Sequence, residues 1–241
     1  MRDLPRRMVA EGLGTAMLLT AVVGSGIMGE RLAAGNVAIT LLANAAATGA
    51  VLLALILTFG SISGAHLNPA VSLAEAWSGN MAWRDLPFYV TAQLSGAFAG
   101  VALAHLMFGL PLFSLSRHVR SGKAQLLGEF VATFGLLAVI KGCAVARRED
   151  TSKSGIEITA FAVAAYITGA YWFTSSTSFA NPAVTLARSV SDTFAGIRPV
   201  DTPGFIAVQM LGAAGATLLF RSLLVVPQQQ SGIPSRGEND G

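Results

Sequence analysis

Two eight-residue segments of this chain are nearly identical and lie 113 residues apart. Residues 68–75 read NPAVSLAE and residues 181–188 read NPAVTLAR, so that six of the eight positions are the same. A match of this length indicates an internal duplication, which restricts the possible folds more than any single residue does. We therefore expect two structurally equivalent halves.

The duplication extends well beyond these two segments. Glu11, in AEGLGT, matches Glu129, in GEFVAT, at an offset of 118 residues. Gln93, in QLSGAFAG, matches Gln209, in QMLGAAGA, at an offset of 116. The second pair of motifs also repeats small residues at a spacing of four, which allows helices to cross closely in a membrane. The nearly constant offset indicates that one complete unit was copied.

Six apolar stretches are long enough to cross a membrane, which requires about 20 mostly apolar residues. The chain is 53% hydrophobic and only 12% charged, about half the charged fraction of a soluble domain. The first stretch could begin a secretory signal, but Glu11 interrupts it and no small-residue cleavage site follows, so we expect it to be retained. The predicted spans are 8–28, 37–59, 86–108, 124–145, 156–176 and 203–224.

Two further apolar segments, 68–77 and 181–190, are too short to span. Ten helical residues reach about 15 Å, half of a hydrocarbon core of about 30 Å. Because each copy has three full spans, the second copy enters the membrane from the opposite side, and the halves are inverted repeats. We expect a first repeat at 1–108 with half-helix 68–77, a connecting loop at 109–123, a second repeat at 124–226 with half-helix 181–190, and a disordered polar tail at 227–241.

The tripeptide Asn-Pro-Ala that opens each half-helix favours a helix N-terminus, since asparagine is a preferred N-cap and proline suits the first helical position. Two N-termini that meet near the midplane place positive potential at one point, which favours a neutral solute with an acceptor oxygen and repels cations. Irregular backbone at this depth is tolerated only beside a water-filled cavity or inside protein. We predict a pore lined by Asn68, Pro69, Ala70, Asn181, Pro182 and Ala183.

Several other classes of function have no support in the sequence. The net charge is only +3 and no basic cluster has interleaved aromatic residues, so we expect no nucleic-acid partner. The single cysteine, Cys143, excludes an internal disulfide and a cysteine-based metal cage. We find no HExxH, no nucleophile motif and no paired carboxylates at the predicted pore, and we expect neither an enzyme nor a cofactor or metal.

The distribution of Lys and Arg indicates an orientation. With the N-terminus inside, the predicted cytoplasmic segments carry ten Lys and Arg residues and the outer segments carry six. We expect a multi-pass protein of the cell (plasma or inner) membrane with both termini in the cytoplasm.

Over about residues 6–226, the paired NPA motifs, the approach ISGAHLNPAV and the two helix glutamates resemble the aquaporin and aquaglyceroporin superfamily. Bacterial members associated with arsenic handling show a similar NPAVTLAR variant. The resemblance implies six transmembrane helices with two re-entrant half-helices, and homotetramers in which each protomer has its own pore. It also implies that Glu11 and Glu129 hold the re-entrant loops by accepting backbone N–H bonds.

The resemblance places a selectivity filter at four positions, which are Thr48, Gly169, Ser178 and Val184 in this sequence. Water-selective members usually carry Phe, His and Arg at three of them, whereas glycerol-conducting members keep the Arg and place Gly in the fifth helix. All four residues here are small and uncharged, so the expected filter is wide and weakly polar.

Other polar and aromatic residues near the predicted pore have alternative interpretations. Arg188 lies one helical turn after Val184, and either replaces the missing arginine near the outer mouth or extends to the outer surface. His66 lies on the inner vestibule in the family, and is either a pH-sensitive gate or, as we prefer, a hydrogen-bonded structural residue. An interfacial aromatic belt accounts for residues 171–173, and His105 belongs to no motif.

The sequence predicts a passive channel for small neutral solutes larger than water. Glycerol, urea and metalloid hydroxides such as arsenous or boric acid are candidates, and methylated arsenic species are also considered because the filter arginine is absent. A water-selective aquaporin is the main alternative, although Gly169 and Thr48 leave room for larger solutes. A coupled secondary transporter would need a charged relay in its pathway, and only the two loop-holding glutamates are available.

Overall fold

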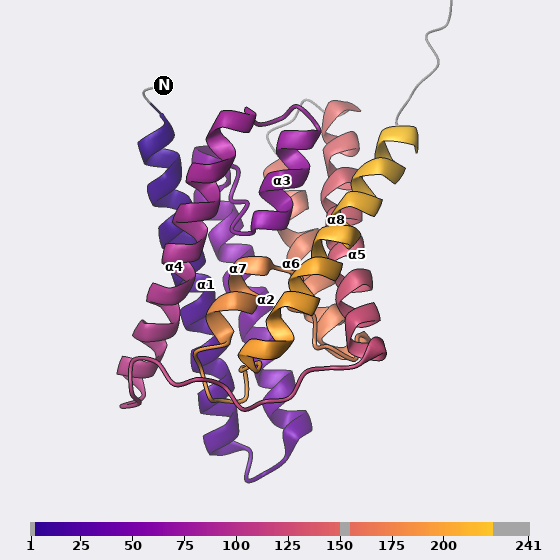
Figure 1. Cartoon of the computed structure of the whole chain (residues 1–241). Coiled ribbons are helices and arrows are strands. Elements are labelled where there is room, and N and C mark those ends of the chain that lie inside the picture. The colour runs from indigo at the N-terminus through magenta and orange to yellow at the C-terminus, as the bar shows by residue number, and fades with distance from the viewer. Residues whose placement is uncertain (1–2, 150–154, 224–241) are drawn as a thin grey trace, which may run out of the picture.

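The computed structural model describes residues 3–149 and 155–223, and all its regular elements in these ranges are helices. Six are long and apolar enough to cross a membrane, and they form one bundle (Figure 1). These are Leu4–Leu32 (α1), Val37–Ser63 (α2), Leu86–Met107 (α4), Lys123–Glu149 (α5), Gly155–Phe173 (α6) and Thr202–Leu223 (α8). The shorter elements are α3 (Pro69–Trp77), α7 (Pro182–Arg188) and the 3-10 turns η1 (Trp83–Asp85) and η2 (Pro199–Asp201). The predicted all-α membrane architecture is confirmed.

The two halves pack in the same way. Helix α1 packs against α2 and α4 in the first half, and α5 packs against α6 and α8 in the second half. Helices α2 and α6 then join the two halves. The half-helix α3 lies toward the end of the bundle that carries the N-terminus, whereas α7 approaches from the other end (Figure 1). This is the arrangement expected of inverted repeats.

Small residues allow the closest helix crossings. A side chain at Gly96 would collide with the carbonyl oxygen of Gly12, and one at Gly100 would collide with that of Ala16, so that α4 lies directly on α1. At the equivalent crossing in the second half, a Cβ at Gly212 on α8 would lie 2.6 Å from a carbonyl oxygen of α5. The small-residue spacing that is seen in both copies therefore has the same structural role in each.

The second half-helix and the connecting segment differ slightly from their predicted ranges. Helix α7 ends at Arg188 rather than at residue 190, because the Ser189 hydroxyl donates to the Leu186 carbonyl at 2.7 Å and the chain turns away. Residues 109–122 form an irregular segment that pairs with the chain after α7: the amide of Ser116 donates to the Ser189 carbonyl at 2.9 Å. The tail predicted at 227–241 lies outside the described residues.

Candidate functional site

Each half-helix begins with the asparagine cap that the sequence predicts. The Asn68 side-chain oxygen accepts the amide of Ala70 at 2.9 Å. The Asn181 oxygen accepts the amides of Ala183 at 3.0 Å and Val184 at 3.3 Å. Both asparagines have extended backbone and precede proline, as an N-cap requires.

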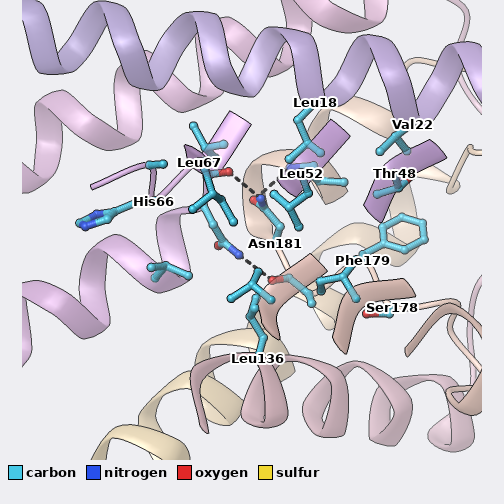
Figure 2. A pocket seen from close by; sticks show the side chains of 18 of the residues that line it. Leu18, Val22, Thr48, Leu52, His66, Leu67, Leu136, Ser178, Phe179 and Asn181 are labelled. Atoms are coloured by element: carbon cyan, nitrogen blue, oxygen red, sulfur yellow. Dashed lines mark hydrogen bonds between the residues drawn. The ribbon is translucent and has the colours of Figure 1, made fainter. Parts of the chain in front are cut away.

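The side-chain amides of the same asparagines connect the two halves. Asn68 Nδ2 donates to the carbonyl of Ala180 at 2.7 Å, and Asn181 Nδ2 donates to the carbonyl of Leu67 at 2.8 Å. Figure 2 shows these two bonds at the centre of the site. Because an amide nitrogen carries two hydrogens, each asparagine retains one donor after making this bond. The two half-helices therefore meet head to head.

Glu11 holds the backbone that leads into the first half-helix. Its carboxylate is fully buried and accepts the amides of His66 at 2.9 Å and Leu67 at 2.7 Å. It also accepts the Ser63 hydroxyl at 2.7 Å and the Gln93 amide at 2.8 Å. Four donors around one carboxylate offset the cost of burying its charge.

Glu129 makes the equivalent contacts in the second half. Its carboxylate is also fully buried, and it accepts the amides of Phe179 at 2.8 Å and Ala180 at 2.9 Å. Gln209 donates to it at 2.6 Å, as Gln93 does to Glu11 in the other half. The two approaches also hold non-glycine residues in the left-handed backbone region, where L side chains are strained. These are Ala65, Leu67, Thr177, Ser178 and Ala180.

A cavity of about 120 Å³ passes the point where the half-helices meet (Figure 2). Its wall includes both asparagines, His66, and three of the four predicted filter residues, Thr48, Ser178 and Val184. The rest of the wall is predominantly apolar, with Leu18, Val22, Leu52, Ile56, Val163 and Ile167 among its side chains. The cavity is therefore amphipathic, with hydrogen-bonding groups beside an aliphatic surface.

The fourth predicted filter residue, Gly169, is not part of this wall. The residues of α6 that line the cavity are Thr159, Val163, Ile167 and Tyr171, spaced by four. Gly169 lies two residues from this face, which turns it about 200° away, and it is exposed beside Phe173. Gly169 therefore does not line this cavity, and Tyr171 is the residue of α6 in its wall near Thr48.

The aromatic belt interpretation holds for only part of residues 171–173. Trp172 and Phe173 are 49% and 58% exposed on the outside of the bundle, whereas Tyr171 is 3% exposed. The Tyr171 hydroxyl lies 3.2 Å from the Thr48 hydroxyl across the cavity wall. An aromatic ring with a polar end thus replaces the glycine that the sequence predicted here.

Arg188 is buried in the cavity wall, with only 1% exposure, so the alternative that it extends to the outer surface is wrong. Its Nε donates to the carbonyl of Ala195, and its guanidinium carbon lies 3.4 Å from the centre of the Phe179 ring. Its Nη1 has no hydrogen-bond partner among the described residues. The wall therefore contains a cation, in contrast to the uncharged filter expected from Val184 alone.

Two residues that the sequence did not single out, Phe179 and Arg120, organise the same region. Phe179 lies between Ser178 and the second NPA motif and lines the cavity. Arg120, from the connecting segment, places its guanidinium 5.0 Å from the Phe179 ring centre. Only the position of Phe179 beside the motif could have indicated a role, and Arg120 carries no motif at all.

Arg120 also connects the loop after α6 with the loop after α7 through hydrogen bonds. Its Nε donates to the carbonyl of Gly196 at 2.8 Å, and its Nη2 donates to that of Phe194 at 3.2 Å. Its Nη1 reaches the carbonyl of Ser176 at 3.3 Å, and its backbone amide donates to Asp201 at 2.9 Å. Burial among these neutral carbonyls lowers the pKa of the Arg120 guanidinium.

The half-buried His66 and the buried His105 make structural hydrogen bonds. His66 Nδ1 lies 3.0 Å from the Ser72 hydroxyl within the first half-helix, in agreement with the structural interpretation. His105 Nε2 lies 2.9 Å from the Ser191 hydroxyl, and its Nδ1 lies 2.8 Å from the Pro111 carbonyl. His105 therefore joins α4 to the connecting segment and to the chain after α7. No group of metal-ligating side chains is found within the described ranges.

Comparisons with known proteins agree with this geometry. The family model described as "Major intrinsic protein" matches residues 2–119 and again residues 115–238, once for each half. The chain is 54% identical to "Aquaglyceroporin AqpS" of Rhizobium meliloti (strain 1021), over 92% of this chain and 91% of that protein. It is 36% identical to "Aquaporin NIP1-1" of Zea mays, over 64% of this chain and 55% of the plant protein.

A solved structure shares the fold. The aquaglyceroporin from Plasmodium falciparum superposes with a TM-score of 0.63 at 20% sequence identity, covering 91% of this chain and 95% of that chain. At this level of identity the likeness concerns the architecture alone.

Proposed function

This chain belongs to the major intrinsic protein family, as a multi-pass aquaglyceroporin-type membrane channel, and we propose that it passes small uncharged solutes larger than water down their gradients. The proposed solutes are glycerol, urea and metalloid hydroxides such as arsenous or boric acid, with methylated arsenic species also included.

One observation carries the choice of solutes, namely the amphipathic wall of the cavity. Asn68 and Asn181 each retain an N–H donor, and Ser178 Oγ has no partner among the described residues. Aliphatic side chains such as Leu52 and Ile167 line the same cavity. A polyol or a methylated hydroxide presents hydroxyls together with an apolar surface. Water has no apolar surface that could contact the aliphatic side chains of the wall.

We assign to the pore the residues of the cavity wall. The half-helix motifs supply Asn68 and Asn181, and the proposed filter consists of Thr48, Tyr171, Ser178, Val184 and Arg188. The other motif residues that the sequence placed in the pore do not line this cavity, namely Pro69, Ala70, Pro182 and Ala183. Glu11 and Glu129 hold the loops, and His66 lies at the end of the cavity near the first half-helix.

The proposal includes the setting of the channel. We infer a homotetramer with one pore in each protomer, in a plasma or inner membrane, with both termini in the cytoplasm. The excess of Lys and Arg on that side supports the orientation. We keep the repeat boundaries at residues 1–108 and 124–226, because the helix pairings are the same in both ranges.

A coupled transporter receives less support from the site. The two buried carboxylates, Glu11 and Glu129, are occupied by backbone amides and glutamine side chains, so neither is free to carry a proton or ion along the path. A passive path needs no such relay.

Light-scattering measurements on proteoliposomes test the proposal. We expect glycerol and urea entry that does not saturate with concentration and does not change when a proton or sodium gradient is imposed. Saturable, gradient-driven uptake would indicate a transporter. Water flow without solute flow would indicate a water-selective channel.

A further inference from the structure

Within the part of the chain that the structure describes, Arg188 is a buried cation without a carboxylate partner. It takes part in none of the ion pairs found among the described residues, although its side chain is almost completely buried. Buried charges in proteins are normally paired, because an isolated ion loses its hydration without compensation. Arg188 instead has one neutral carbonyl acceptor, that of Ala195, and its buried Nη1 makes no hydrogen bond among the described residues. The residue itself is part of the cavity wall.

The equivalent position in the first half shows the contrast. Glu75 lies seven residues after Asn68, as Arg188 lies seven residues after Asn181. Glu75 is neutralised by Lys141, whose Nζ lies 2.6 Å from its carboxylate oxygen. One half of the duplication therefore carries a closed ion pair at this position, and the other half carries a cation only.

The other charges near Arg188 do not neutralise it. Arg120 adds a second guanidinium at the Phe179 ring, and its donors are directed to backbone carbonyls. Glu129 holds the approach to the second half-helix, and its oxygens accept the amides of Phe179 and Ala180 and the side chain of Gln209. Two guanidinium groups therefore lie beside the Phe179 ring, and the Glu129 carboxylate that lies near them is occupied by other donors.

A second polar group in the same wall also lacks a partner. Ser178 Oγ is buried, lines the cavity and makes no hydrogen bond among the described residues. A hydroxyl can donate to an anion, and the Arg188 Nη1 can donate to the same ligand class. Most of the other side chains of the wall are aliphatic, which suits a small, singly charged and weakly hydrated ion better than a multiply charged one.

We propose that a small monoanion, such as nitrate or formate, binds at Arg188 as its counterion and blocks the passage of neutral solutes while it is bound. The inference rests on the proposed function in one respect: the anion can block solutes only if the cavity is the solute path. The channel would then be inhibited by small anions on either side of the membrane, without any gradient of the anion.

Glycerol flux at varied anion composition tests the proposal. The proteoliposomes contain the same salt inside and outside. Gluconate, which is too large for the site, is the starting anion, and nitrate replaces it stepwise at constant ionic strength. We expect nitrate to reduce wild-type glycerol flux to less than half. Arg188→Gln should conduct glycerol without inhibition by nitrate. Arg117→Gln, which removes a 93% exposed arginine side chain, should be inhibited as the wild type is.

Two results would overturn the anion site: a wild-type channel whose glycerol flux is indifferent to nitrate, or equal inhibition of the wild type and Arg188→Gln. If the wild type passes no neutral solute, the proposed function fails instead. In that case, and also if Arg188→Gln does not fold, chloride-35 NMR relaxation of the detergent-solubilised wild-type protein tests the site directly. Excess relaxation that nitrate displaces supports the site, and its absence contradicts it.

Discussion

Thr48 on α2 and Tyr171 on α6 hold their hydroxyl oxygens 3.2 Å apart, although 123 residues separate them in the chain. The two helices come from different halves of the duplication and pack against each other. Their contact places an aromatic ring in the wall of the cavity at the place where a glycine was expected. The Tyr171 ring therefore forms part of the wall of the proposed solute path.

We predict that Tyr171→Ala raises glycerol and urea permeability several-fold relative to water, because truncating a buried ring leaves open space in the wall. Stopped-flow light scattering gives both permeabilities from one preparation. Trp172→Ala is the matched control, since Trp172 is 49% exposed on the outside of the bundle and should leave the ratio unchanged. An unchanged ratio in Tyr171→Ala would show that this ring does not limit the path.

The half-helix caps could be predicted from the sequence, whereas the face of α6 in the cavity wall could not. The duplication, the asparagine caps and the carboxylates that accept loop amides follow from residue identity and local geometry, and the structure has all of them. The face of α6 that reaches the cavity is set by its packing against α2 and α5. A shift of two residues rotates a helix position by about 200°, so a spacing carried over from relatives selected Gly169 instead of Tyr171.

Contacts between residues far apart in the sequence are a second feature that could not be predicted. A cation one turn after Val184 could have extended to the surface or turned inward, and only the positions of Ala195 and Phe179 distinguish these outcomes for Arg188. The role of Arg120 depends on carbonyls more than 50 residues away in sequence, which no local pattern reveals.

Val184→Arg should lower the permeability to glycerol and urea while sparing water. Val184 is 5% exposed and lines the cavity, so a long cationic side chain there narrows the path. The solute panel in proteoliposomes measures this effect. Val119→Arg, at a 57% exposed position of the connecting segment, introduces the same residue away from the cavity and should behave as the wild type. Equal loss of water and solute flow in Val184→Arg would contradict the filter assignment.

Arg120→Lys should reduce glycerol permeability more than water permeability. Lysine cannot reproduce the forked donors that reach Gly196 and Phe194, so Phe179 loses its support and its ring is free to enter the path. The glycerol-to-water ratio is the informative readout, because a smaller number of folded channels lowers both flows equally. Arg117→Lys, at an exposed arginine of the same segment, should keep the wild-type ratio. If Arg120→Lys and Arg117→Lys show the same glycerol-to-water permeability ratio, Arg120 does not influence solute selectivity.

Glu11→Gln should lower the stability of the protein, since an amide offers one acceptor oxygen where the carboxylate receives four donors. Hydrogen bonds to charged groups contribute about 1.5–3 kcal/mol each, so a loss of this size is expected. Thermal unfolding in detergent measures the change. Glu157→Gln, at an exposed position of α6, should unfold with the wild type. If both variants unfold together, Glu11 does not hold the loop.

Solutes pass through the cavity beside the junction of the two half-helices, and cysteine modification at Val184 tests this central claim most directly. The lone Cys143 is first replaced by serine, and Val184→Cys is then treated with a small membrane-impermeant thiol reagent during flux measurements. We predict that modification abolishes glycerol and urea flow, that glycerol in excess slows the modification, and that Val119→Cys reacts without loss of flow. Complete modification at position 184 with undiminished flow would show that the path lies elsewhere.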